Sequence, residues 1–235
     1  MMENFENKNL VQNISTIDVV KAFMYKVFSW MFFALSITAL VAYWFASNEA
    51  LISLLYTERG LSALGWLIML SPLGLVLLMS FRFDKLSASA MTGIFVLYSI
   101  LMGMSLSTIF LIYTVKSIAI TFSITAGMFG VMAITGYVTK TDLTKFGAIM
   151  FMGLIGIIIA SLVNFFAKSS SLDYIISFLG VLIFTGLTAY DVQKLKQIGL
   201  SSSASMKTAI YGALSLYLDF INLFLFLLRF FGNRK

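Results

Sequence analysis

Seven long apolar runs, separated by short polar linkers, restrict this chain to very few folds. The runs cover residues 27–45, 61–81, 86–113, 117–138, 146–167, 172–191 and 208–231. Each is close to the roughly 20 apolar residues with which a helix crosses the hydrocarbon core of a bilayer. Because only 11% of the residues are charged, against about 25% in a soluble domain, polar side chains are too few to cover a globule. We therefore predict an all-α polytopic membrane protein with seven transmembrane helices.

The polar ends of the chain set the boundaries of this transmembrane domain, which we place at residues 27–231. Residues 1–26 carry mixed charges and lack the basic start, short apolar core and small-residue cleavage site of a signal peptide. We expect them to form a short cytoplasmic segment, and we expect residues 232–235 to form a basic tail. Pro72, the sole proline, lies in the second run and predicts a kink there, since proline removes a backbone hydrogen bond from a helix.

Lysine and arginine residues indicate the orientation of the chain in its membrane. The side that includes the N-terminus holds most of them, namely Lys8, Lys21, Lys26, Arg82, Lys85, Lys140, Lys145, Lys194, Lys196 and Lys207. The opposite side holds Arg59, Lys116 and Lys168 together with the basic C-terminus. Because cytoplasmic loops are enriched in these residues, we predict a cytoplasmic N-terminus. The short loops and the absence of cysteine and histidine favour a bacterial inner (plasma) membrane. Seven full crossings would place the basic tail outside the cell, against the enrichment of positive charge in cytoplasmic segments. Either the last run is a short central or re-entrant helix, or the tail is an exception to this enrichment.

Composition excludes several classes of chemistry. The chain has neither cysteine nor histidine, so it has no disulfides, no thiol catalysis, and neither the commonest metal ligand nor the commonest general base. Any proton chemistry must use aspartate, glutamate, lysine or tyrosine. The net charge of +6 fits cationic cytoplasmic loops. We therefore expect the lipid bilayer as a partner, no nucleic acid and no cofactor.

Small residues recur at close spacing along three of the runs. They are Ser99, Gly103 and Ser107, then Gly127 and Gly130, then Gly153 and Gly156. Small side chains allow helix backbones to approach closely. We therefore predict tight helix packing at these positions and assign them no binding role.

Two acidic residues lie within apolar runs, although a carboxylate at mid-bilayer costs roughly 2.5–3.5 kcal/mol. Asp219 lies near the middle of the seventh run, in the string LYLDFINLF, so it should face the interior of the bundle. Asn222 follows three residues later on the same helical face, and we expect it to donate a hydrogen bond to Asp219. Asp191 ends the sixth run beside Lys194, where either a functional or an interfacial role is open.

The two aspartates occur in similar contexts, since Tyr190 precedes Asp191 and Tyr217 lies two residues before Asp219. We count both tyrosines, like the asparagine, as supporting polar groups. If the sixth and seventh helices pack together, the two carboxylates do not both ionise readily, and the pair titrates as a unit. Such a pair would sense pH without histidine. With a rise of about 1.5 Å per residue, their depths match only if the sixth helix extends past Lys194 or the seventh begins later.

Arg82 is a candidate partner for this pair, because it ends the second run on the predicted cytoplasmic side and could reach inward to a carboxylate. An ordinary cytoplasmic anchor is an equally supported interpretation of this arginine. Carboxylate oxygens are also suitable ligands for Ca²⁺. Asp191 and Asp219 without other oxygens would form a weak, transient calcium site, which suits passage of the ion.

Two strings resemble the Bax inhibitor family, the transmembrane Bax-inhibitor-motif proteins and their bacterial relatives. These are residues 186–196, GLTAYDVQKLK, and residues 216–224, LYLDFINLF, with a Leu-Arg pair at 228–229. The plan of a short tail, seven spans and a basic end fits the family along nearly the whole chain. The resemblance implies six helices wrapped around a central C-terminal helix, with Asp191 and Asp219 as the pH sensor. By position, it also implies that Arg82 latches a closed state.

From the residues and the resemblance together we expect a pH-sensitive calcium leak channel and not an enzyme. Calcium ions and protons would be its ligands, with calcium as the permeating ion and loss of the shared proton as the opening step. A secondary transporter stays open as an alternative, although we find no internal repeat, and so does a non-conducting membrane scaffold. An intramembrane aspartyl protease is disfavoured, because Asp219 lacks the Gly-x-Gly-Asp context and Pro72 is the only proline.

Overall fold

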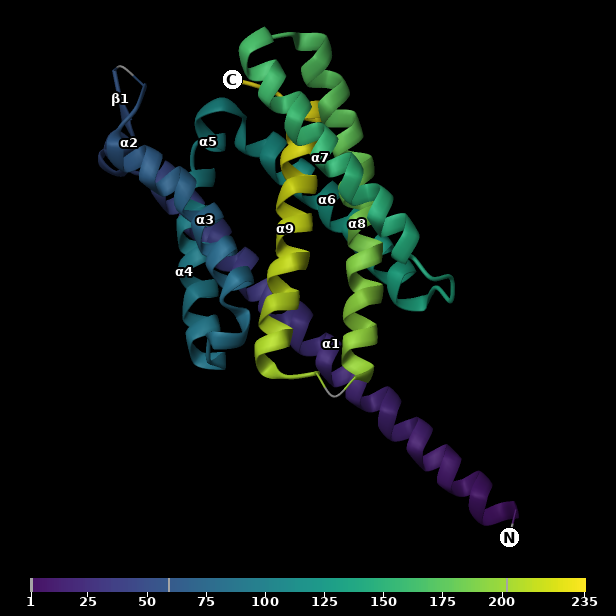
Figure 1. The fold of residues 1–235 in the computed structure, drawn as a ribbon. Coiled ribbons are helices and arrows are strands. Elements are labelled where there is room, and N and C mark those ends of the chain that lie inside the picture. Colours follow the sequence, from purple (N-terminus) through teal and green to yellow (C-terminus); the bar gives the residue numbers. More distant parts are fainter. Residues whose placement is uncertain (1, 59, 202) are drawn as a thin grey trace.

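The structure is a computed structural model that describes residues 2–58, 60–201 and 203–235, with side chains from Ile17 onward. It is a bundle of long helices (Figure 1). In chain order the elements are α1 (Met2–Ala46), α2 (Glu49–Leu55), β1 (Tyr56–Thr57), β2 (Gly60–Leu61), α3 (Ala63–Phe81), the short 3₁₀ helix η1 (Phe83–Lys85), α4 (Ala88–Leu106), α5 (Ile109–Ile112), α6 (Val115–Val138), α7 (Thr144–Ala167), α8 (Ser170–Leu200) and α9 (Met206–Phe231).

The prediction of seven transmembrane helices is confirmed for the described part of the chain. Seven helical segments there are long and apolar enough to cross a membrane. They are Ile17–Ala46, Ala63–Phe81, Ala88–Ile112, Val115–Val138, Thr144–Ala167, Ser170–Leu200 and Met206–Phe231. Helix α3 continues through the buried Pro72 without interruption.

Serine and threonine side chains fix where five of these helices begin. Each hydroxyl accepts a hydrogen bond from the backbone N–H three residues later, which satisfies one of the donors left free in the first helical turn. The capping residues are Ser62, Ser87, Thr114, Ser169 and Ser205. The polar residues of the short linkers therefore set the ends of the spans.

Two helices extend beyond the bounds predicted from the sequence, the first at its start and the sixth at its end. Helix α1 runs unbroken through the predicted boundary at residue 26, and its candidate span begins at Ile17, because Val20 and Phe23 are already buried against the bundle. Helix α8 continues to Leu200 instead of ending at residue 191. In addition, the first linker contains α2 and the β1–β2 hairpin, which the sequence did not predict; Asn48 caps α2 by accepting from the backbone N–H of Ala50 over 3.0 Å.

Helix α9 lies at the centre, as the family resemblance implies. It packs against α1, α4, α6 and α8, while α3 packs on α4 and α7 packs on α8. In the most apolar window of α9, 56% of the residues are buried, against 11% for α7. The same fraction for α8 is 56%, so α8 and α9 together form the inner part of the bundle.

The C-terminal tail lies at the end of the bundle opposite the N-terminus (Figure 1). Helix α9 has 26 residues and so extends about 39 Å, enough for a full crossing, and the re-entrant alternative does not hold. The tail is bound to α5 and to the linker that follows it. Arg234 forms a β-bridge with Tyr113 of the linker, and the Lys235 ammonium donates to the carbonyl of Phe110 in α5 over 2.7 Å. Backbone oxygens thus hold the basic tail at this end.

The glycines divide into packed and unpacked positions. At Gly103 an added Cβ would lie 2.8 Å from the backbone oxygen of Thr38, which confirms tight packing of α4 on α1. The same prediction is wrong for three glycines whose Cβ position has no neighbour within 4 Å, Gly127, Gly130 and Gly156. The spacing of small residues does not by itself say whether their face meets another helix or the bilayer.

Candidate functional site

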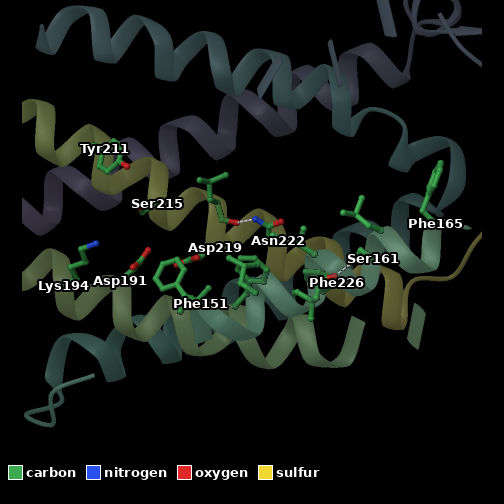
Figure 2. Close-up of a pocket in the computed structure, with 17 residues that line it drawn as sticks. Phe151, Ser161, Phe165, Asp191, Lys194, Tyr211, Ser215, Asp219, Asn222 and Phe226 are labelled. Carbon is green, nitrogen blue, oxygen red and sulfur yellow. Dashed lines mark hydrogen bonds between the residues drawn. The ribbon is translucent and has the colours of Figure 1, made fainter. Parts of the chain in front are cut away.

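A cavity of about 760 Å³ lies between α7, α8 and α9, and we refer to it as the α7–α9 cavity (Figure 2). Its volume is in the range of pockets that hold small molecules, about 300–1,000 Å³. Helix α7 contributes apolar side chains and Ser161. The polar side chains from α8 and α9 are Asp191, Lys194, Tyr211, Ser215, Asp219 and Asn222.

The sequence of α9 places one stripe of the helix on this cavity. Tyr211, Ser215, Leu218 and Asn222 follow one another at intervals of three or four residues, which is the spacing of one helical face. All four are half-buried, whereas most of the residues between them are buried against other helices. The stripe is therefore the side of the central helix that α1, α4 and α6 leave uncovered.

Asp219 is the least usual group in the cavity wall. The residue is only 5% exposed, and its Oδ2 atom has no hydrogen-bond partner within the described part of the chain. Buried polar atoms are nearly always paired, so a single unpaired carboxylate oxygen marks a candidate functional site. Figure 2 shows this side chain on the same cavity as Asp191.

The extended α8 is what brings the two aspartates together. Depth is counted here from the end of the bundle where the short linker joins α8 to α9. Asp191 lies nine residues before the end of α8 at Leu200, which is about 14 Å along the helix. Asp219 lies 13 residues after the start of α9 at Met206, which is about 20 Å along the helix. Because α8 and α9 are antiparallel and joined by a short linker, the carboxyls lie about one helical turn apart in depth. The condition that the sixth helix extends past Lys194 is met.

The prediction that Asn222 donates to Asp219 is wrong. The Asn222 amide donates to the backbone oxygen of Leu218, one turn earlier in the same helix, over 2.8 Å. That carbonyl is four residues earlier on the same face of α9, so the amide reaches it from its own helix. Asn222 still lines the cavity, but it leaves Asp219 Oδ2 without a donor.

The two predicted supporting tyrosines lie apart from the carboxyls. Tyr217 is fully buried on the opposite side of α9, where its hydroxyl and that of Thr38 are 2.7 Å apart and its ring meets Tyr98 edge to face. Tyr190 packs on α7, with its ring centroid 6.1 Å from that of Phe151. Both tyrosines therefore hold helices around the site and do not contact the aspartates through a described hydrogen bond.

Arg82 is not brought to the pair in this structure. The residue caps the end of α3 and is exposed, and among the described residues the one ion pair joins Arg229 to Asp173 over 3.4 Å. The cation that lines the cavity is instead Lys194, one helical turn after Asp191 on α8. That three-residue spacing is readable in the sequence, where Lys194 counts only as a sign of the membrane interface.

Gln193 binds the α6–α7 linker to α8 beside the site, a role that the sequence did not predict. Its Oε1 accepts from the backbone N–H of Leu143 and its Nε2 donates to the backbone oxygen of Thr141, each over 2.8 Å. The side chain is only 7% exposed. These two hydrogen bonds fix the start of α7, and thereby one wall of the cavity, relative to Asp191.

The donor set of the cavity favours transient contact with cations. Among the described residues no three histidine, cysteine, aspartate or glutamate side chains gather as a metal site. Two carboxyls, the hydroxyls of Ser215 and Tyr211, and the amide of Asn222 offer oxygen atoms, which hard cations prefer. Such a wall can attract a cation without holding it firmly.

Comparison with known proteins places the chain in a family. The sequence model of the family described as "Inhibitor of apoptosis-promoting Bax1" matches residues 20–235. The chain belongs to the Bax inhibitor family. Its relatives in this family include the inner membrane protein YbhL of Escherichia coli, 50% identical over 221 residues that cover 92% of this chain and 93% of that protein. A protein of Borreliella burgdorferi is 46% identical over 231 residues, covering 97% of this chain and 98% of its own.

Proposed function

We propose that this member of the Bax inhibitor family is a pH-sensitive calcium leak channel of a bacterial inner membrane. The observation that carries the proposal is the placement of Asp219, a buried carboxyl without a partner, on the same cavity as Asp191. The position of a homologue in the inner membrane of Escherichia coli supports the location.

In this proposal the two carboxyls share a proton in the closed state. Two carboxylates on one cavity repel each other when both are ionised, so they titrate as one unit. Loss of the shared proton adds a negative charge to the wall, which spreads the helices that carry the pair and attracts a calcium ion. The oxygen atoms of the α9 stripe then stand in for part of the hydration shell of the ion.

Two residues are candidates for the positive charge that balances the aspartate pair. The resemblance assigns a latch to Arg82, which is exposed at the end of α3 in this structure. Lys194 lines the cavity and is the cation nearest in sequence to Asp191. We propose that Lys194 balances the single negative charge that the pair keeps while it shares a proton. A latch through Arg82 requires α3 to move toward the cavity.

The N-terminus is proposed to lie in the cytoplasm. Of the linkers at its end of the bundle, those that follow α3 and α6 carry Arg82, Lys85 and Lys140, in keeping with the excess of positive charge in cytoplasmic loops. In this orientation the α8–α9 linker is cytoplasmic, and the aspartate pair is reached from the cytoplasmic side.

The experiment is calcium flux into liposomes that hold the purified chain, measured across about pH 6 to 8. Asp219→Asn should remove the pH response. The matched control is Asp142→Asn, since Asp142 lies in the exposed α6–α7 linker outside the cavity.

Asp142 is a suitable control because its pKa is lowered, so its charge does not change in the pH range of the experiment. Hydrogen bonds from the hydroxyl and then from the backbone N–H of Thr144 hold the pKa of Asp142 below its ordinary value. A group with a lowered pKa is ionised throughout the neutral range and changes charge only in acid. Asp142→Asn should therefore keep the pH response of the wild type. A response that survives Asp219→Asn contradicts the proposal, and absence of flux at every pH favours a scaffold or a transporter.

A further inference from the structure

The α7–α9 cavity has two halves of opposite character. One half holds the aspartates with Lys194 and Tyr211. The other half is mostly apolar: Ile158, Leu162 and Phe226 line it, and Ser161 and Asn222 are its polar side chains. We propose that the cavity is a binding site for an amphiphile with a protonated amine and a hydrocarbon tail.

The polar half lacks one positive charge once the aspartate pair has lost its shared proton. With all groups ionised, the carboxylates of Asp191 and Asp219 face one ammonium group, that of Lys194. Tyr211 is the other titratable group in the wall, and the α7 side contributes none. A ligand ammonium placed at Asp219 would donate to the unpaired Oδ2 atom and bring the cavity to neutrality.

The apolar half is open to the bilayer. Ile158 and Leu162 line the cavity and are also 51% and 62% exposed at the surface of α7. A hydrocarbon tail can therefore enter from the lipid while the amine reaches the carboxyls. From Asp219 to Phe226 the cavity follows α9 for seven residues, or about 10 Å, which sets the length of tail that it covers.

The wall distinguishes this ligand from other amphiphiles of the membrane. A neutral acyl chain would fill the apolar half and leave Asp219 Oδ2 without a donor, so it gains no more there than in lipid. A fatty acid would add a third negative charge beside two carboxylates. An alcohol hydroxyl can also donate to the carboxylate, but only a cationic head group adds an ion pair to that hydrogen bond, which makes the amine roughly 10- to 100-fold tighter than the matching alcohol.

The test uses the full chain in phosphatidylcholine nanodiscs and an alkylamine with a diazirine near the end of its tail. Photolabelling followed by mass spectrometry should place the label on the α7 and α9 residues of the cavity. Excess dodecylamine should compete, and dodecanol and dodecanoate should compete roughly 10- to 100-fold less well. Equal competition by the three probes, or label spread over lipid-facing residues of other helices, overturns the proposal.

Two variants separate the halves of the site. Asp219→Asn should reduce the preference for the amine over the alcohol to near unity. Ser161→Phe should block the tail, whereas Ser123→Phe should not, because Ser123 is an exposed serine of α6 with the same hydrogen bond to the backbone oxygen four residues earlier.

Amine binding is measured without calcium, so it is independent of the proposed channel. A chain that fails to conduct calcium but labels as described refutes the leak channel alone. A chain that conducts calcium but shows no preference for the amine refutes the amine site alone. Labelling that Ser123→Phe abolishes as fully as Ser161→Phe also contradicts the site.

Discussion

Replacing Asp219 with leucine should stabilise the protein while it removes the pH response. Leaving a buried polar atom unpaired costs about 1–3 kcal/mol, and Asp219 Oδ2 is such an atom. Leucine has no polar atom to satisfy, and the open cavity beside residue 219 has space for the larger side chain. For a chain of about this length, 1 kcal/mol shifts the Tm by about 2–4 °C, so the expected gain is about 2–12 °C.

The assay is thermal unfolding of the purified protein in one detergent, with calcium flux measured on the same samples. Asp173→Leu is the matched control, because Asp173 is a partly exposed aspartate of α8 that pairs with Arg229. A pair of this kind contributes less than about 1 kcal/mol, so its loss should leave the Tm unchanged or slightly lower. If Asp219→Leu lowers the Tm, the carboxyl has a stabilising partner, and the reasoning from an unpaired oxygen is wrong.

Three further predictions concern packing, the cavity wall and orientation. Gly136→Leu should strongly destabilise the chain, because a Cβ there would collide with the backbone of Ala189, whereas Gly130→Leu, with open space around it, should not; thermal unfolding measures both. Gln193→Ala should cost about 1–3 kcal/mol and speed hydrogen exchange in the α6–α7 linker, and the exposed Gln197→Ala should change neither. Lys168→Cys, in a chain that lacks cysteine, should react with an impermeant maleimide from the periplasmic side; labelling only from the cytoplasm would reverse the proposed orientation.

The spans could be predicted from sequence because lipid demands a long apolar run for each crossing. Their ends could not, since interior contacts decide them. Val20 and Phe23 belong to a stretch with charged neighbours, yet they are buried where α1 meets the bundle. Gln193 and Lys196 look like interfacial residues, but α8 continues past them because one binds the α6–α7 linker and the other donates to the backbone oxygen of Tyr137.

The residues of the candidate site could be predicted from the sequence only in part. An aspartate in an apolar run stands out in one sequence because burying it is costly, and Asp219 is indeed buried on the cavity. Helical spacing places Asn222 on the correct face but does not show that its amide bonds its own helix. Side-chain direction around a helix and contacts between distant helices decide which cation lines the cavity, and the structure has Lys194 there and Arg82 at the surface.

The central claim is that Asp191 and Asp219 act as one pH-sensing unit, and a double-mutant cycle on calcium flux tests it most directly. The wild type, Asp191→Asn, Asp219→Asn and the double variant are compared in liposomes at one acidic and one alkaline pH. If the pair titrates as a unit, each single variant loses the pH response and the double variant loses no more. Losses that add up across the two single variants, or a pH response that persists in the double variant, would contradict the claim.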